Sequence, residues 1–438
     1  MKHALTPVAI SIVATVLAVA PVQAAQPAPF SDRDIIQAYH YLLGRLLVIR
    51  QEHLDLKEGF KWNQFVHRAP GAISRAGLDP GIAYSEAWVA VDEKSCTIVT
   101  LPVIKGRYYT VQLLSGWGET VANISERTRP KHPAGGYAMC LKGADVHLPR
   151  DARRIDLPGR KSRVVARVEL GADPAEAVRL QKQITMKPTG SPRAEPPVAI
   201  TVFFNDQLPR VEAFNRVDAL LASEPDSSPG MGPLQARARA IAKAARNVEE
   251  LKRIDDVIVK RAIPQFMAGL QQIGKTRNGW HRPARTGDYG SDYLSRSMAS
   301  FVDIRANTSR EAVHYTTETD GKGQKLEGSN VYTMTFPKGQ PQALARYFWS
   351  VVAVDPVAFT VMDNPLKRYL LSNQSALQPN PDGSVTLFFA AKQPVGAPPQ
   401  NWLPTPAGKP YNLTFRFYGP GDKVISGGYF PPPLVKTI

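Results

Sequence analysis

The sequence lacks long apolar runs beyond its first residues, and it has very few cysteines. After residue 24, no segment reaches the roughly 20 predominantly apolar residues that a transmembrane helix needs. The two cysteines, Cys96 and Cys140, lie far from residue 24, so neither is placed to carry a lipid anchor next to a cleaved leader. These absences predict a soluble mature chain.

Short catalytic signatures are missing as well. The sequence has no Gly-x-Ser-x-Gly pentapeptide, which would place a serine nucleophile on a strand-to-helix turn. It has no zinc-binding His-Glu-x-x-His, no Cys-x-x-Cys and no glycine-rich loop for phosphate or a dinucleotide. His40 and His53 could share one helix face, but two histidines without a third ligand rarely hold a metal. We therefore expect no metal and no cofactor. These absences do not exclude a catalytic site assembled from distant strands.

The first residues predict a secretory signal peptide. Lys2 is followed by an apolar run over residues 8–20 and by the small-residue triplet Val22-Gln23-Ala24. We expect cleavage after Ala24, which gives a signal peptide at 1–24, and a location in the periplasm or outside the cell. In an oxidising compartment Cys96 and Cys140 are expected to form a disulfide, and two separately buried thiols are the alternative.

Acidic residues are outnumbered by basic ones. The chain has 54 Lys and Arg against 38 Asp and Glu, a formal net charge of +16, which attracts anions. Because export removes nucleic acid as a partner, the charge predicts anionic glycans, lipid headgroups or acidic small molecules. A charge that merely keeps the protein in solution is the alternative. The stretch that could contact an anionic envelope surface, or form a solvated hairpin, contains Arg150, Arg153, Arg154, Arg160, Lys161, Arg163 and Arg167.

The length of the chain and its many proline and glycine residues indicate several domains built from short strands. About 414 residues remain after the leader, more than the ~250 to 300 at which single cores stop growing. The 38 Pro and 32 Gly suit many short strands. We predict a mainly β fold with two jelly-roll-like β-sandwich domains joined by a helical region. The expected segments are an N-terminal helix at 25–60, a first sandwich at 61–206, a linker and helical segment at 207–285, and a second sandwich at 286–438.

Local patterns predict particular helices and strands. Apolar residues recur at helical spacing between residues 31 and 56, and Ser31 and Asp34 occupy capping-box positions. Another helix is expected over residues 234–262, ending near Pro264, although its basic residues precede its acidic ones and so oppose the helix dipole. Strands are expected at 83–91, 96–103, 108–114, 137–141, 162–170, 198–204, 331–336, 347–354, 384–390 and 413–418.

Several motifs of the second half occur in the same order as in a known bacterial family. They are Tyr289-Gly-Ser-Asp-Tyr293 with Arg296, Asp320-Gly321, Tyr332-Thr-Met-Thr-Phe-Pro337, Phe348-Trp-Ser350, Asn364-Pro365, Arg368-Tyr369, Asp382-Gly-Ser384, Asn401-Trp-Leu-Pro404, and Arg416 with Tyr418. With them, the second half resembles the domain of unknown function 1214 (DUF1214). The first half resembles its usual partner, the domain of unknown function 1254 (DUF1254), through Arg107-Tyr-Tyr109, Gln112-Leu-Leu114 and Gly135-Gly136-Tyr137.

The resemblance implies a pair of jelly-roll-like sandwiches with helices between them and an envelope location. It supplies no activity. Where the family usually has Asn-x-Asp-Thr-x-Tyr, this chain has Asp79-Pro-Gly-Ile-Ala-Tyr84, which lacks the second carboxylate and the threonine. A pocket that depends on that run lacks those two groups here.

Polar and aromatic residues of the second half form the candidate ligand site. Arginine offers a planar fork for carboxylate or phosphate, and Tyr and Trp offer flat faces for a sugar or an acyl chain. The predicted ligand-binding residues are Asp292, Tyr293, Arg296, Arg368, Tyr369, Asn401, Trp402 and Arg416, with Tyr418 beside them. Alternatively, these residues fix loop corners, with each arginine bonded to backbone carbonyls.

Two functions are consistent with this sequence. The first is an envelope protein that binds an anionic or a carbohydrate- or lipid-like ligand. The second is a periplasmic hydrolase-type enzyme whose acid–base groups come from separate β-strands. Its candidate groups are His281, Asp292, Tyr293 and Glu327. The expected partner is a small molecule or a glycan in either case, and not nucleic acid.

Overall fold

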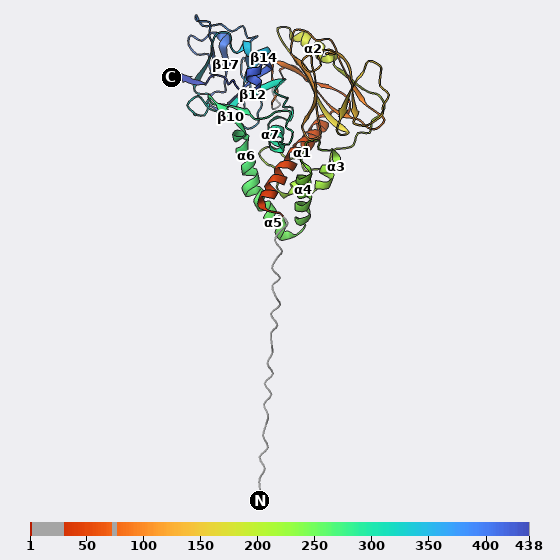
Figure 1. Cartoon of the computed structure of the whole chain (residues 1–438). Helices are drawn as coiled ribbons and strands as arrows, with labels where there is room; N and C mark the ends of the chain where they lie inside the picture. Colours follow the sequence, from red (N-terminus) through yellow and green to blue (C-terminus); the bar gives the residue numbers. More distant parts are fainter. Residues whose placement is uncertain (2–29, 72–76, 438) are drawn as a thin grey trace.

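The computed structural model describes Met1 and residues 30–71 and 77–437. Nearly all of the predicted signal peptide lies outside these residues. Within them, no helix is both long and apolar enough to cross a membrane. Two β-rich domains lie side by side, and a body of helices lies beneath them (Figure 1). The prediction of a mainly β fold, with two sandwich domains joined by a helical region, is confirmed.

The first sandwich consists of two sheets packed face to face. For the described residues, the strand orders are β1-β2-β8-β4-β5 and β7-β6-β3-β9. The strands are β1 Val66–His67, β2 Ile82–Ala90, β3 Thr97–Leu101, β4 Tyr109–Leu114, β5 Thr120–Ile124, β6 Gly135–Leu141, β7 Arg153–Leu157, β8 Lys161–Glu169 and β9 Thr185–Pro188. Val111, Tyr137 and Val164 belong to the buried core between the sheets. The helix α2 (Pro174–Gln183) packs against β2 and β8.

A disulfide joins Cys96 to Cys140 in this sandwich. Cys96 directly precedes β3, and Cys140 lies in β6, which is paired with β3 in antiparallel fashion. The register brings the two Cα atoms to 4.5 Å. Both cysteines are fully buried.

The second sandwich has a larger and a smaller sheet. The larger one, here named the β12–β18 sheet, has the order β10-β11-β12-β18-β14-β15, and the smaller one has the order β17-β16-β13-β19 among the described residues. The strands are β10 Gly274–Arg277, β11 Trp280–Pro283, β12 Ala312–Thr317, β13 Val331–Phe336, β14 Ala345–Val354, β15 Leu370–Ser372, β16 Val385–Ala390, β17 Trp402–Pro404, β18 Asn412–Pro420 and β19 Val435–Thr437. Short helical turns connect them: η3 Gln342–Leu344, η4 Pro399–Asn401 and α8 Asp422–Ile425.

Alternation along the central strands gives the β12–β18 sheet two different faces. Val313 and Tyr315 on β12, with Phe415 and Phe417 on β18, enter the sandwich core. Because successive side chains of a strand point to opposite faces, the intervening residues lie on the outer face. That outer face is polar, and it bears His314, Thr316, Thr414, Arg416 and Tyr418.

The helical body is built around α1 (Asp32–Glu58), which lies at the centre of Figure 1. The predicted capping box is present, since Ser31 and Asp34 bond each other's backbone N–H groups. Around α1 lie η1 Val211–Phe214, α3 Val217–Ser223, α4 Gly232–Ala244, α5 Val248–Val257, the π-turn η2 Ile258–Ala262, α6 Ile263–Gln272 and α7 Tyr293–Asp303. A Cβ atom on Gly44 would lie 2.5 Å from the Ser297 Oγ, so glycine permits α1 and α7 to pack closely.

The predicted helix over residues 234–262 is wrong in both its continuity and its end. The chain breaks between α4 and α5, where the Asn247 side chain accepts the N–H groups of Glu249 at 2.9 Å and Glu250 at 3.1 Å. The acidic residues therefore lie in the first turn of a new helix, where they match its dipole. Pro264 does not end the helix, because it lies in the first turn of α6, directly after the π-turn.

The predicted strand at 198–204 is also wrong. This segment runs as a loop along α1, where the Val198 carbonyl oxygen contacts the His53 Nε2 at 2.9 Å. Phe203 is buried against the core of the helical body. Val198, Ile200 and Phe203 pack against helices and not against a second sheet, while Val202 and Phe204 are exposed.

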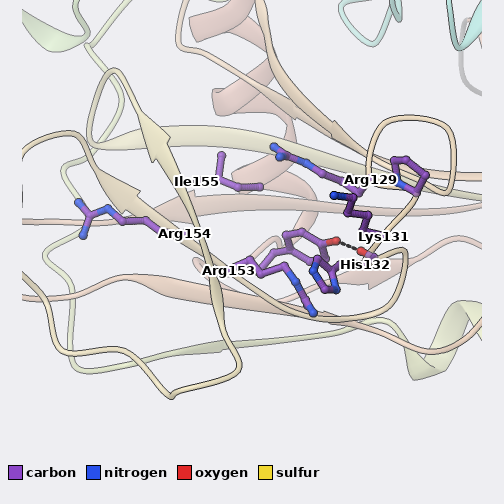
Figure 2. Close-up of a pocket in the computed structure, with 8 residues that line it drawn as sticks. Arg129, Lys131, His132, Arg153, Arg154 and Ile155 are labelled. Carbon is purple, nitrogen blue, oxygen red and sulfur yellow. Dashed lines mark hydrogen bonds between the residues drawn. The ribbon is translucent and has the colours of Figure 1, made fainter.

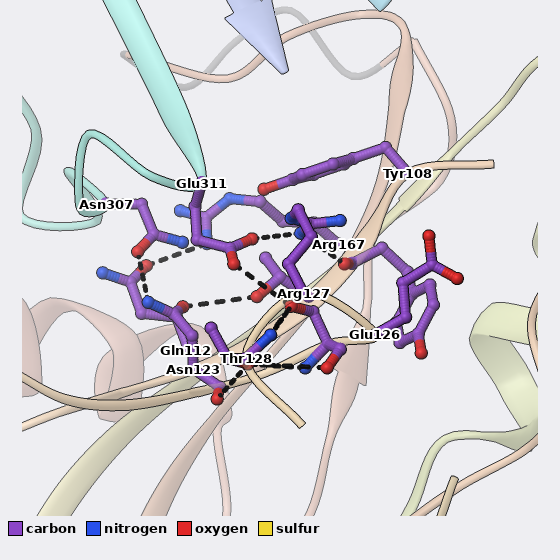
Figure 3. A network of polar contacts seen from close by, with 12 residues as sticks. Tyr108, Gln112, Asn123, Glu126, Arg127, Thr128, Arg167, Asn307 and Glu311 are labelled. Atoms are coloured by element: carbon purple, nitrogen blue, oxygen red, sulfur yellow. Dashed lines mark hydrogen bonds and ion pairs between the residues drawn. The ribbon is translucent and has the colours of Figure 1, made fainter. Parts of the chain in front are cut away.

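A polar layer joins the two sandwiches (Figure 3). Glu311, the residue before β12, accepts a hydrogen bond from the Ser125 Oγ at 3.1 Å and forms an ion pair with Arg127. Asn123 donates to the Asn307 Oδ1 at 2.9 Å. Buried polar groups of this kind require matched partners, so the layer fixes how the domains face each other.

Aromatic rings continue the contact between the domains. Phe348 of β14 and Tyr418 of β18 stack with ring centroids 4.2 Å apart, and Tyr108 of the first sandwich lies 5.0 Å from the Tyr418 ring. All three are buried. The outer face of the β12–β18 sheet is therefore covered by the first sandwich at this end.

Candidate functional site

The other end of that outer face is covered by helices and encloses a cavity of ≈ 200 Å³. Its walls come from α6 and α7 and are mainly apolar, including Leu270, Met298 and Val302. Phe359, from the loop after β14, closes another side. The floor is the outer face of the β12–β18 sheet. An apolar cavity with few polar groups is the common form of a small-molecule site.

Strand register places the polar groups of the floor in rows. Across β12 and β18, His314 is paired with Arg416 and Thr316 with Thr414. His281 on β11 is paired with Thr316. All five residues line the cavity. The alternation that sends Tyr315 and Phe415 into the core thus sends these groups into the cavity.

Arg416 has unsatisfied hydrogen-bonding capacity in the cavity. The side chain is only 3% exposed. Its Nη2 makes a long hydrogen bond of 3.4 Å to the Gly77 carbonyl, and its Nη1 lies 3.5 Å from the Asp79 Oδ2. Neither Nε nor Nη1 has a hydrogen-bond partner among the described residues. Orphaned buried donors are rare in folded proteins, so this guanidinium is suited to an external acceptor.

Two neutral histidines belong to the same floor, and one of them, His314, lies beside Arg416. Burial and the Arg416 charge lower the pKa of His314 to about 3. Burial also lowers the pKa of His281, whose Nδ1 lies 3.2 Å from the Thr276 Oγ1. The His281 Nε2 finds no hydrogen-bond partner within the described part of the chain. His281 therefore adds a second buried polar side chain to the lining of the cavity.

The acidic group of the cavity is neutralised by a neighbour. Burial raises the pKa of Asp303, but the adjacent Arg305 outweighs it and holds that pKa below its ordinary value. The Arg305 Nε donates to the Asp303 Oδ1 at 2.8 Å. Two other cations belong to the lining: Arg416, whose carboxylate partner Asp79 lies 3.5 Å away, and Arg285, which donates to the Tyr289 carbonyl.

Three of the predicted ligand-binding residues lie in the helical body instead. Arg296 forms two hydrogen bonds with the buried Asp226, at 2.9 and 2.7 Å. Asp292 caps α7 by accepting the Ser295 N–H at 3.0 Å, and Tyr293 packs edge-on against the Tyr41 ring. None of them lines the cavity.

Four others fix loop corners of the second sandwich. Arg368 donates to the Trp402 carbonyl at 3.0 Å, and Asn401 donates to the carbonyls of Gln378 and Thr386 at 2.8 and 2.9 Å. The Trp402 Nε1 donates to the Ala390 carbonyl at 2.9 Å, and Tyr369 donates to Asp363 at 2.8 Å. Their polar groups are used by the fold itself, so the predicted residues do not line a single cavity.

Of the predicted set, the structure brings Arg416 and His281 to one cavity. Tyr418 donates to the Asp79 Oδ2 at 2.8 Å in the neighbouring contact between the domains. Glu327 lies in a turn bridged to Pro410 and does not line the cavity. The sequence reasoning missed His314 and Thr414. Thr414 alternates with core residues on a predicted strand, and that signal could have found it, whereas the strand that carries His314, β12, was itself not predicted.

The described residues contain no group of three or more His, Cys, Asp and Glu side chains arranged to hold an ion. His40 instead contacts the Ala262 carbonyl oxygen at 2.8 Å, which is a structural role.

Comparison with known families gives two matches. The family described as "Protein of unknown function (DUF1254)" matches residues 62–188, and the family described as "Protein of unknown function (DUF1214)" matches residues 311–422. The first covers most of the first sandwich and the second most of the second one. No curated protein matches the chain.

Comparison with solved structures gives two matches. The VPA0106 protein from Vibrio parahaemolyticus has a TM-score of 0.66 at 19% sequence identity, over 93% of this chain and 100% of that chain. An uncharacterized protein from Burkholderia cenocepacia has a TM-score of 0.45 at 13% identity, over 90% of this chain and 87% of that chain. The first likeness supports the fold described above.

Proposed function

We propose that this chain, which carries a DUF1254 domain followed by a DUF1214 domain, binds a small carboxylate with an apolar body in the cavity described above. Neither family description names an activity, so the proposal is argued from the cavity. The ligand lies between the outer face of the β12–β18 sheet and the helices α6 and α7. Its carboxylate accepts hydrogen bonds from Arg416, and its apolar body contacts the helical walls.

The observation that carries the proposal is the unsatisfied guanidinium of Arg416. A buried donor without a partner costs about 1 to 3 kcal/mol, and more when it is charged. A ligand acceptor removes that cost at Nε or Nη1, the two atoms that lack hydrogen bonds among the described residues. A charge-assisted bond to a carboxylate is the stronger choice.

The local charge favours a single negative charge on the ligand. The cavity lining and its ion-pair partners hold Arg285, Arg305 and Arg416 against Asp79 and Asp303, which leaves one positive charge, and both histidines of the floor have lowered pKa values and stay neutral at pH 7. A phosphate dianion would meet too little positive charge here. A monocarboxylate would balance the net charge of the site.

The apolar walls determine the body of the ligand. Leu270, Met298, Val302 and Phe359 line the cavity, so a linear or branched hydrocarbon is favoured over a sugar, whose hydroxyls would be left without partners. Burial of each methylene contributes about 0.8 kcal/mol. The volume of ≈ 200 Å³ suits a short chain.

Binding is favoured over hydrolysis by the surroundings of the histidines. Neither His281 nor His314 is hydrogen-bonded to a carboxylate in the described part of the chain, so the orienting partner of a catalytic base is missing. Asp292 is engaged in capping α7.

We propose further that binding takes place outside the cytoplasm. The leader pattern of residues 2–24 and the Cys96–Cys140 disulfide support export, since disulfides persist in oxidising compartments. Cell fractionation with N-terminal sequencing of the mature chain tests this. Recovery of the full-length chain from the cytoplasm would refute it.

A thermal-shift and calorimetric series tests the ligand. Linear carboxylates from butanoate to decanoate are compared with the matching amides, and carboxylates alone are expected to raise the melting temperature. Ala299→Leu, which fills the cavity, should weaken binding by at least about 10-fold, and Arg416→Gln should abolish the preference for carboxylate over amide. Arg368→Gln, at a loop corner outside the cavity, is the control that keeps binding. The proposal fails if no carboxylate binds, or if Ala299→Leu binds as the native chain does.

A further inference from the structure

The basic stretch of the first sandwich divides into a buried part and an exposed part. On β8, Lys161 pairs with Glu52 at 2.7 Å and Arg163 pairs with Asp55 at 3.0 Å, and all four side chains are buried. Arg167 is buried as well. These three cations face the protein interior and cannot contact an anionic surface, which corrects the prediction for the stretch as a whole.

The exposed part belongs to a different pocket. Arg153 and Arg154 lie on β7, an edge strand of the sheet β7-β6-β3-β9 in the first sandwich. Together with the loop before β6 they line a surface pocket of ≈ 290 Å³ (Figure 2). The pocket is lined by Arg129, Pro130, Lys131, His132, Tyr137, Arg153, Arg154 and Ile155. Segments that are separate in the sequence thus contribute cations to one hollow.

Most of these cations have no carboxylate partner. Arg129 and Lys131 form no ion pair with any described residue. Arg153 donates to the Ala134 carbonyl at 3.3 Å and lies 5.6 Å from the centroid of the Tyr137 ring. Only Arg154 is paired, with Asp156 at 2.7 Å. No acidic side chain lines the pocket, so three positive charges are left without a counterion there.

The floor of the pocket is rigid. Tyr137 is 1% exposed, and its hydroxyl donates to the His132 carbonyl, which ties the loop to β6 (Figure 2). Ile155 on β7, the strand paired with β6, is also buried. The loop that carries Arg129 and Lys131 is therefore tied to β6, next to the strand that carries Arg153.

We propose that this pocket binds a phosphate monoester on a sugar-sized body. Three unpaired cations suit a dianion better than a single carboxylate, and guanidinium groups match the geometry of phosphate oxygens. The volume of ≈ 290 Å³ is close to the lower end for ligand pockets, which fits a head group and excludes a long chain.

This site is independent of the carboxylate cavity. It lies on the first sandwich, shares no lining residue with the cavity and differs from it in charge. The same phosphate chemistry can come from a free sugar phosphate or from a phosphorylated lipid headgroup, and the experiment separates these sources.

Isothermal titration calorimetry of the full mature chain tests the proposal with glucose 6-phosphate, glucuronate and glucose at physiological ionic strength. Glucose 6-phosphate is expected to bind at least 10-fold more tightly than glucuronate. Co-sedimentation with vesicles of phosphatidylcholine, with or without phosphatidic acid, forms the lipid arm. Binding in either arm supports the proposal, and the stronger arm identifies the source.

Paired variants locate the binding. Arg129→Gln with Lys131→Gln removes two pocket charges, and Arg160→Gln with Lys142→Gln removes two exposed charges of the same sandwich outside the pocket. The first pair should weaken binding at least 10-fold, and the second should change it less than 2-fold. Unchanged melting temperatures verify folding. Equal losses in both pairs, equal affinity for glucuronate, or no binding in either arm would overturn the proposal.

Discussion

Asp79 of the first sandwich and Arg416 of the second approach to 3.5 Å where the two domains meet. The same Asp79 oxygen accepts hydrogen bonds from the Ser350 Oγ at 2.5 Å and from the Tyr418 hydroxyl at 2.8 Å. One buried carboxylate therefore ties the first sandwich to β14 and β18, and it also forms an ion pair with Arg416 that is too long for a hydrogen bond. Arg416 therefore belongs both to the contact between the domains and to the proposed ligand site.

Asp79→Asn should separate these two roles. The amide keeps hydrogen-bonding capacity but removes the charge opposite Arg416, and breaking a buried pair of this kind costs roughly 3 kcal/mol. We expect a lower melting temperature together with a larger stabilisation by carboxylate ligands, because Arg416 then loses the carboxylate with which it forms an ion pair. Differential scanning calorimetry with and without ligand measures both effects. An unchanged ligand-induced shift would contradict the shared role.

Asp226→Asn should destabilise the helical body. Arg296 and Asp226 are both 1% exposed and are joined by two hydrogen bonds, and the guanidinium lies 5.1 Å from the Trp117 ring centroid. Leaving Arg296 without its carboxylate should cost about 3 to 5 kcal/mol in urea unfolding. Asp218→Asn is the matched control, since its ion pair with Arg239 is exposed and is expected to contribute less than about 1 kcal/mol. Similar losses in the two variants would argue against a special role for Arg296.

Glu224 should make the protein less stable as the pH rises toward neutrality. Burial raises its pKa to about 7, despite the opposing charge of Arg45. Below pH 4.5 both the folded and the unfolded carboxyl are protonated, and between about pH 4.5 and 7 only the folded state keeps the proton. Stability from this group is therefore lost across that window, by about 3 kcal/mol.

Glu224→Gln should remove this part of the pH dependence, because the amide does not titrate. Free energies of unfolding measured from pH 4.5 to 8 test it, with the exposed Glu318→Gln as the control. If the native chain and Glu224→Gln show the same slope, the carboxyl is not the titrating group.

Removal of the disulfide should destabilise the first sandwich. Cys96 and Cys140 are separated by 44 residues, and closing a loop of that length contributes about 4 kcal/mol in the chain-entropy description. The double variant Cys96→Ala with Cys140→Ala should lower the urea midpoint, and reductant should lower that of the native chain by a similar amount. A native midpoint that does not respond to reductant under unfolding conditions would show that the bond is absent.

The sequence alone determined the local elements of this protein. The capping box of Ser31 and Asp34, the two-residue alternation of the strands and the turn signals between them are short-range properties, and they predicted α1 and most of the longer strands. The break at Asn247 could also have been predicted, because an N-cap residue with Glu249 and Glu250 in the turn after it is typical of a helix start. The apolar residues at helical spacing on both sides of Asn247 led instead to the prediction of one continuous helix.

Only the tertiary structure decided which side chains meet. Asp79 and Tyr418 are 339 positions apart in the chain, and they touch because two domains pack in one orientation. Arg416 reaches a cavity while Arg368 fixes a loop corner, although both looked alike in the sequence, because strand register and the helices above the sheet differ between the two places. Side-chain type is a local property, whereas burial and partners arise from contacts between distant segments, and these contacts create the sites.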